Sequence, residues 1–267
     1  MLKDITIGQF FPGESLLHRL DPRFKIIITC IFVVMLFIGD SVWGLVIGSV
    51  FTFGAIALSK IPNRLFVKSI KPIFPFLIFT AVLNLVFISD GDVLFKWRFI
   101  KVTEGGIETS VYMLVRIVLL IAGSSLLTYT TSPIALTDAL EQLMSPLKKL
   151  KFPVHELSMM MTIALRFIPT LIEETDKIMS AQKARGAEID SGSLRARVKN
   201  LIPILIPLFV SSFRRAEELA TAMECRCYNG GDGRTRLRQL KSGGRDFAAL
   251  AVTCAFMGAI IAVNLML

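Results

Sequence analysis

The stretch Val111–Tyr129, VYMLVRIVLLIAGSSLLTY, is a run of apolar residues that carries a single charge, Arg116. A helix needs about 20 predominantly apolar residues to cross the hydrocarbon core of a bilayer. The stretch therefore predicts a membrane span at about 110–130. A charge inside a span is costly and marks a functional site by default. For Arg116 we favour a structural role, in which the side chain pairs within the protein or extends to the membrane interface.

Similar apolar runs predict four more spans, at about 24–40, 43–59 and 72–89 and within 246–267. The composition agrees, with 53% hydrophobic residues and a mean hydropathy of +0.63. A soluble domain of this length carries more charge than the 19% found here. The sequence thus predicts an all-α membrane protein with about five transmembrane helices. Residues 1–130 form its N-terminal membrane region with four spans, and 246–267 form its last transmembrane helix.

Residues 131–245 separate the fourth span from the fifth and hold more than half of the 30 Lys and Arg residues. Lys and Arg accumulate in the cytoplasmic loops of membrane proteins. We therefore expect the segment 131–245 to be cytoplasmic. The same rule predicts a cytoplasmic N-terminus, and an odd number of spans then predicts a C-terminus outside.

Turn and capping signals divide 131–245 into three helices, at about 133–149, 154–184 and 194–224. Ser132-Pro133 is a typical helix start, and Ser145-Pro146 interrupts the first helix. The second and third helices each have an apolar first half and a charged second half. This pattern predicts coupling helices that lie at the membrane surface and project their polar ends into the cytoplasm.

The second and third helices also align with each other at an offset of 41 residues, which places Ala184-Arg185-Gly186 over Cys225-Arg226-Cys227. Each helix therefore ends with one Arg between small residues. The planar guanidinium group of an Arg can bind carboxylates or backbone carbonyls of a partner, so the pair predicts two equivalent docking points. The alternative is that each Arg only complements the helix dipole, and the residues alone leave both hypotheses open.

No motif for catalysis, metal binding or nucleotide binding is present. Cys225 and Cys227 have no second pair and no nearby His, and His155-Glu156 lacks the second His of H-E-x-x-H because Met159 takes its place. There is no G-x-x-x-x-G-K-[ST] motif either. We therefore expect no enzyme activity, no metal and no cofactor, which argues against an intramembrane protease.

Two further functional classes are less well supported. A stand-alone secondary transporter or channel remains the alternative, although it would need paired ionisable residues in the spans, where Arg116 is the only clear one. A nucleic-acid binder would need aromatic residues beside its basic residues, and Arg234–Arg245 has few. Anionic lipid head groups suit that basic stretch better.

Three stretches together resemble the transmembrane coupling subunit (T component) of energy-coupling factor (ECF) vitamin transporters. Ser15–Lys25, SLLHRLDPRFK, is similar to the N-terminal signature of that family and includes Leu20-Asp21-Pro22. Ala184-Arg185-Gly186 is similar to its first Ala-Arg-Gly motif, and Ala222–Tyr228 lies where the second one falls. The resemblance covers essentially the whole chain. It departs from the family at Cys225 and Cys227, which replace Ala and Gly.

The resemblance implies a bacterial cell-membrane protein that works in a complex. The implied partners are two ABC-type ATPase subunits (EcfA and EcfA′), a small membrane-embedded substrate-binding S subunit and the lipid bilayer, with no nucleic acid. Each motif Arg, Arg185 or Arg226, would insert into a groove of one ATPase. The apolar parts of the coupling helices would hold the S subunit for the uptake of vitamins or other micronutrients.

Overall fold

The computed structural model describes residues 10–39, 41–88, 93–97, 100–187, 194–230 and 240–266. The chain divides into two compact units. The first, called the membrane unit below, is formed by Gly8–Ala139 and Leu240–Leu267. The second contains Leu140–Gln239 and is called the crossed-helix unit. Helices dominate both units, which confirms the predicted all-α membrane fold.

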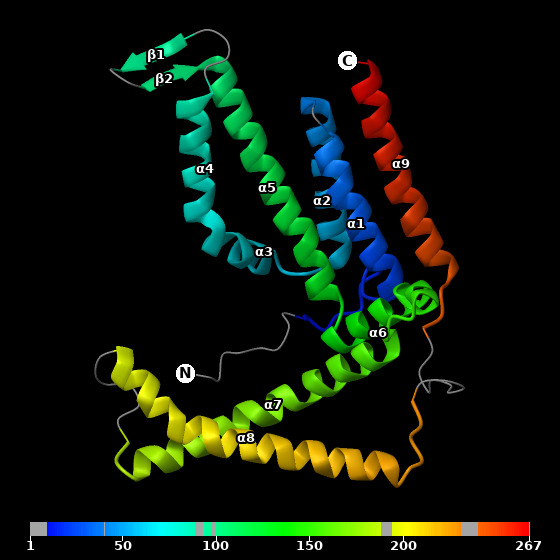
Figure 1. Ribbon diagram of the computed structural model, residues 1–267. Coiled ribbons are helices and arrows are strands. Elements are labelled where there is room, and N and C mark those ends of the chain that lie inside the picture. Colours follow the sequence, from blue (N-terminus) through cyan, green and yellow to red (C-terminus); the bar gives the residue numbers. More distant parts are fainter. Residues whose placement is uncertain are drawn as a thin grey trace. The chain divides into compact units, whose positions relative to one another are not determined.

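The membrane unit is a bundle of helices with one short hairpin (Figure 1). Its elements are α1 (Pro22–Ile38), α2 (Val42–Ser59), α3 (Asn63–Ile70), the 3-10 helix η1 (Lys71–Ile73), α4 (Phe74–Phe87), β1 (Val93–Trp97), β2 (Ile100–Thr103), α5 (Glu104–Thr130) and α9 (Gly244–Met266). The antiparallel strands β1 and β2 lie between α4 and α5 in the chain. The described residues form no other strand. Helix α6 (Pro133–Leu143) continues from this unit into the next.

Four described segments are long and apolar enough to cross a membrane: Val42–Ser59, Asn63–Phe87, Glu104–Thr130 and Gly244–Met266. Helix α1 has 17 residues, at the lower limit of about 17 to 25 for a span. Together they account for the five predicted spans. The third differs from its predicted range because α3 and η1 extend it toward the N-terminus, where Pro72 and Pro75 interrupt regular helix hydrogen bonding.

Polar contacts hold the first turn of α1. Asp21 is its N-cap, accepts a hydrogen bond from the Arg23 backbone N–H at 2.9 Å, and pairs with the Arg23 guanidinium at 2.7 Å. Burial raises the pKa of the Asp21 carboxyl, but the hydrogen bonds and charge of Arg23, with the charge of Lys25, bring the net pKa below its ordinary value. The Asp21 backbone N–H donates to Asp246 at the start of α9, 2.7 Å away. The buried Lys25 ammonium donates to the Thr130 carbonyl at 2.9 Å, which ties α1 to the end of α5.

The last turn of α1 is held in the same way. The Arg116 guanidinium on α5 donates to the Gly39 carbonyl at 2.9 Å and to the Tyr112 hydroxyl at 2.7 Å, and it lies over the Tyr112 ring. On α9, Asn264 donates to the Ile38 carbonyl. Carbonyls at a helix end have no partner within the helix and no water in the bilayer core, so neighbouring helices must supply donors. Arg116 thus has a structural role and is buried rather than extended to the interface.

Close packing completes the core between α1, α5 and α9. Phe32, Met35 and Leu36 of α1 pack with Leu119 of α5 and Ile260 of α9. Glycine allows the helices to approach closely, as small residues do in membrane bundles. A Cβ atom at Gly123 of α5 would lie 2.2 Å from the Phe32 ring, and one at Gly48 of α2 would lie 2.6 Å from Leu36.

The crossed-helix unit contains η2 (Ser145–Leu150), α7 (Val154–Ala184) and α8 (Leu194–Glu224). The predicted bounds of the second and third helices are confirmed. The first is shorter than predicted, because α6 ends at Leu143 and a 3-10 helix follows. Pro146 lacks a backbone N–H and cannot continue the α-helix. Predictions that fall on 188–193 and 231–239 lie outside the described residues.

We expect Gly123→Leu to destabilise the membrane unit by about 1–3 kcal/mol, because the new side chain overlaps the buried Phe32 ring. Gly258→Leu is the matched control, since nothing lies within 4 Å of a Cβ built there. Thermal unfolding of both variants in detergent, followed by size-exclusion chromatography, measures the difference. Equal midpoints for the two variants would show that the Gly123 contact is not close.

Candidate functional site

Helices α7 and α8 run antiparallel and cross (Figure 1), and one acidic residue marks the crossing. Glu174 of α7 accepts hydrogen bonds from the Ser211 hydroxyl and the Arg215 guanidinium of α8. Both charged side chains are mostly buried, with 20% exposure for Glu174 and 31% for Arg215. The contact is an ion pair with an added hydrogen bond, a geometry that resists sliding of one helix along the other.

The crossing also joins residues that the sequence alignment makes equivalent. Glu174 and Arg215 are 41 residues apart, which is the offset that superimposes Ala184-Arg185-Gly186 on Cys225-Arg226-Cys227. In an antiparallel pair related by a local two-fold axis, each residue on the axis meets its own equivalent. The two helices are therefore arranged about an approximate two-fold axis near Glu174 and Arg215.

Each helix ends in a hydrogen-bonded turn of the Schellman type, in which a residue with positive φ follows the last helical residues. In α7, Gly186 has φ +85°, its N–H donates to the Lys183 carbonyl at 3.0 Å, and the Ala187 N–H donates to the Gln182 carbonyl at 3.0 Å. Arg185 is the C-cap. The turn satisfies the last carbonyls with backbone N–H groups, so the Arg185 side chain is not needed for this.

The end of α8 repeats this turn residue by residue. Cys227 has φ +53°, its N–H donates to the Glu224 carbonyl at 2.9 Å, and the Tyr228 N–H donates to the Met223 carbonyl at 3.1 Å. Arg226 holds the position that Arg185 holds in α7. A side chain other than Gly costs about 1–2 kcal/mol in this backbone region, so Cys227 is accepted here at some strain. The departure from Ala-Arg-Gly therefore leaves the backbone of the motif unchanged.

Both Arg side chains are exposed at the tips of their helices, together with Ala184, Gly186, Cys225 and Cys227. Neither the Arg185 nor the Arg226 side chain makes a hydrogen bond or an ion pair with the part of the chain that the structure describes. Arg185 follows Glu174 by 11 residues, and Arg226 follows Arg215 by 11 residues. At 1.5 Å per residue, each tip lies about 16 Å from the crossing, on opposite arms.

A polar cluster lies at the Arg226 end. The Tyr228 hydroxyl lies 3.3 Å from His155 Nε2 and 3.1 Å from the Met159 sulfur, and His155 Nδ1 lies 3.2 Å from Glu141. At the other end, Gln182 donates to the Pro203 carbonyl at 3.4 Å. These contacts, and the crossing pair, were missed by sequence reasoning. The 41-residue offset contained the signal for the crossing pair, because it aligned Glu174 with Arg215.

Apolar side chains are exposed along the first half of α8, where the sequence predicted an apolar surface. They are Leu201, Ile202, Leu205, Ile206, Phe209, Val210 and Phe213, called the α8 apolar face below. Met160 and Met161 are exposed on the first half of α7. An exposed apolar area of this extent marks a surface for a protein partner or a membrane.

The residues of the predicted N-terminal signature lie outside the crossed-helix unit, and the two Cys residues of the second motif form no metal site with other described residues. Leu20, Asp21 and Pro22 belong to the membrane unit, where Asp21 and Pro22 begin α1. Among the described residues, no group of three or more His, Cys, Asp or Glu side chains could hold a metal ion. Cys225 and Cys227 are exposed free thiols.

Comparison with known proteins covers both units of the chain. Residues 13–237 match the CbiQ family, described as cobalt transport protein. The energy-coupling factor transporter transmembrane protein EcfT of Clostridium kluyveri is 56% identical over 96% of this chain and 95% of its own length. The EcfT proteins of Ruminiclostridium cellulolyticum and Bacillus subtilis are 51% and 48% identical, over 98% and 94% of this chain and 97% and 94% of their own lengths.

The matches include the membrane helices and both Arg motifs. A transmembrane component agrees with the apolar helices of the membrane unit. The chain therefore belongs to the CbiQ family, among the energy-coupling factor transporter transmembrane proteins.

Proposed function

We propose that the chain couples two ABC-type ATPases to a membrane-embedded substrate-binding subunit during uptake of vitamins or other micronutrients. The ATPases bind and hydrolyse ATP, and α7 and α8 transmit their motion to the S subunit. The chain itself is not catalytic. The observation that carries this proposal is the pair of free Arg tips, Arg185 and Arg226, placed symmetrically about the α7–α8 crossing.

The symmetry of the tips fits a pair of similar ATPases. An interface with two similar partners needs two similar contact points related by a two-fold axis. Arg185 and Arg226 share the same cap position, the same backbone turn and the same distance from the crossing. A guanidinium group with no partner among the described residues is available to carboxylates or carbonyls in an ATPase groove, where Arg can bind with two parallel hydrogen bonds.

The crossing converts motion at the tips into motion of the apolar surface. Glu174 and Arg215 hold the two helices together about 16 Å from each tip. The α8 apolar face extends from Leu201 to Phe213. Phe213 is close to the crossing, and Leu201 lies on the arm opposite Arg226. A displacement of the tips therefore reaches the S subunit through rigid helices, if that subunit docks on the α8 apolar face.

The charge distribution supports a cytoplasmic position for both tips. Arg185 and Arg226 lie in the segment that holds most of the chain's basic residues, and such segments stay in the cytoplasm. ATP is available there. The protein then lies in a bacterial cell membrane. Its N-terminus and residues 131–245 face the cytoplasm, and its C-terminus is outside.

We expect Arg185→Glu and Arg226→Glu each to weaken ATPase association, because a carboxylate replaces the docking cation. The loss should be about tenfold or more, since truncating a buried charged contact costs about 2–5 kcal/mol. Lys177→Glu and Arg214→Glu are matched controls, as exposed charge reversals in α7 and α8 away from the tips. Co-purification with tagged ATPases from membranes measures the effect, and unchanged recovery of ATPases with both tip variants would refute docking.

Exchange of the charges of Glu174 and Arg215 tests whether their ion pair couples the motion of α7 to that of α8. Glu174→Arg alone should lower uptake, because like charges would meet at the crossing at a cost of about 1–3 kcal/mol. The double variant Glu174→Arg/Arg215→Glu should restore uptake by restoring opposite charges. Uptake into vesicles that contain all subunits measures both. A double variant no more active than the single one would show that the pair does not couple the helices.

We expect the purified chain alone to hydrolyse no ATP, because it has no phosphate-binding loop. Release of phosphate from ATP, measured with and without added ATPase subunits, tests this. Hydrolysis by the pure chain that survives a second purification step would contradict the proposed division of labour.

A further inference from the structure

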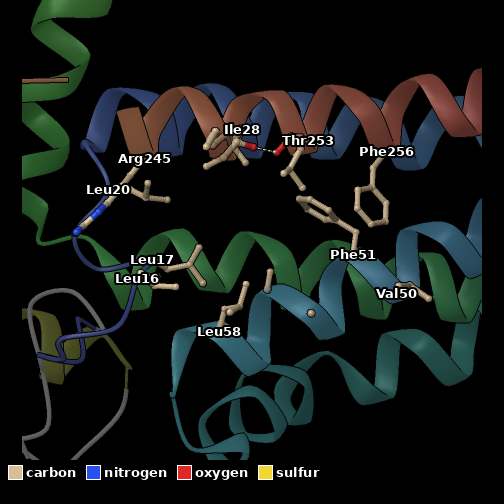
Figure 2. Close-up of a pocket in the computed structure, with 15 residues that line it drawn as sticks. Leu16, Leu17, Leu20, Ile28, Val50, Phe51, Leu58, Arg245, Thr253 and Phe256 are labelled. Carbon is tan, nitrogen blue, oxygen red and sulfur yellow. Dashed lines mark hydrogen bonds between the residues drawn. The ribbon is translucent and has the colours of Figure 1, made fainter. Parts of the chain in front are cut away.

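The membrane unit contains an apolar groove between α1, α2 and α9, with a volume of about 530 Å³ (Figure 2). Leu17 and Leu20 before α1, Phe51 and Leu58 of α2, and Val252 and Phe256 of α9 are among its lining residues. This volume is within the range of about 300–1,000 Å³ typical of ligand sites. Leu16, Val50, Leu58 and Val252 are more than half exposed, so the groove opens at the surface of the bundle.

The groove has a charge at one end only. Arg245 is the one charged side chain among the described residues that line it, and Figure 2 shows it beside Leu20 at the end opposite Phe256. The apolar wall of α9 extends from Ala248 to Phe256, about 12 Å. Thr253 does not add a free polar group, since its hydroxyl donates to the Ala249 carbonyl at 2.9 Å.

No acidic side chain among the described residues forms an ion pair with the Arg245 guanidinium group. Arg245 is exposed and forms no hydrogen bond there either. The nearest acid in sequence, Asp246, is buried and accepts from the backbone N–H groups of Asp21 and Gly243 at 2.7 Å each. Lys60, two residues after Leu58, and Lys241 are exposed and add positive charge near this end.

We propose that this groove binds one anionic phospholipid, with an acyl chain between α1, α2 and α9 and the phosphate group at Arg245. Basic pockets between transmembrane helices at a membrane surface bind anionic lipid head groups. The apolar wall and the single cationic end match the two parts of such a lipid.

Gly54 of α2 allows the groove to be filled without disturbing the fold. It lines the groove, and no heavy atom lies within 4 Å of a Cβ built there. Gly54→Leu therefore blocks the acyl-chain site with little strain. Gly258→Leu on α9 is the matched control, because Gly258 is equally open and lies outside the groove.

Native mass spectrometry of the full chain in detergent tests the proposal, with palmitoyl-oleoyl phosphatidylglycerol or phosphatidylcholine added as the probe lipid. The wild-type chain should retain one phosphatidylglycerol in preference to phosphatidylcholine. Gly54→Leu should abolish this retention, and Gly258→Leu should not change it. Arg245→Gln should weaken phosphatidylglycerol retention about fivefold and remove the preference for it, whereas Arg64→Gln on α3 should do neither.

Equal retention of both lipids by the wild-type chain, or equal retention by the two Gly variants, would overturn the proposal. Thermal unfolding confirms that each variant is folded. A photo-crosslinking amino acid that replaces Leu58 in cells identifies the occupant directly. An adduct with the mass of a phospholipid supports the proposal, and adducts with a protein alone would show that the groove is a subunit interface instead.

Discussion

Every helix leaves backbone carbonyls without partners at its C-terminal end, and this structure depends on how those carbonyls are satisfied. In the membrane unit, side chains from other helices donate to carbonyls at the ends of α1 and α5, in addition to backbone caps. Arg116 and Asn264 reach the end of α1, and Lys25 reaches the end of α5. These contacts hold α1 to both α5 and α9 and fix the bundle.

In the crossed-helix unit, backbone N–H groups cap the ends of α7 and α8, with no contribution from the Arg185 and Arg226 side chains. The turns at Gly186 and Cys227 donate N–H groups to the last residues of α7 and α8. This difference has a functional consequence. The guanidinium of Arg116 is committed to the fold, whereas those of Arg185 and Arg226 remain available to partners.

The two tips are alike in backbone and unlike in side-chain contacts. At the Arg226 end, Tyr228 contacts His155 and Met159 of α7, and near the Arg185 end Gln182 of α7 donates to the Pro203 carbonyl of α8. The approximate two-fold axis at Glu174 and Arg215 therefore relates two arms whose side-chain contacts differ in kind.

The sequence by itself determined the spans, the bounds of α7 and α8, and the two Arg motifs, because apolar runs, Gly and Pro act through local geometry. It also predicted the equivalence of Ala184-Arg185-Gly186 and Cys225-Arg226-Cys227, since the 41-residue offset is visible in one dimension. Only the tertiary structure decided that Glu174 meets Arg215, that Cys227 takes a glycine-like φ, and that Arg116 caps α1. The groove at Arg245 likewise combines residues from α1, α2 and α9. The contacts of Glu174 and Arg116 and the lining of the groove depend on which residues distant in sequence become neighbours, and that is set by packing rather than by local pattern.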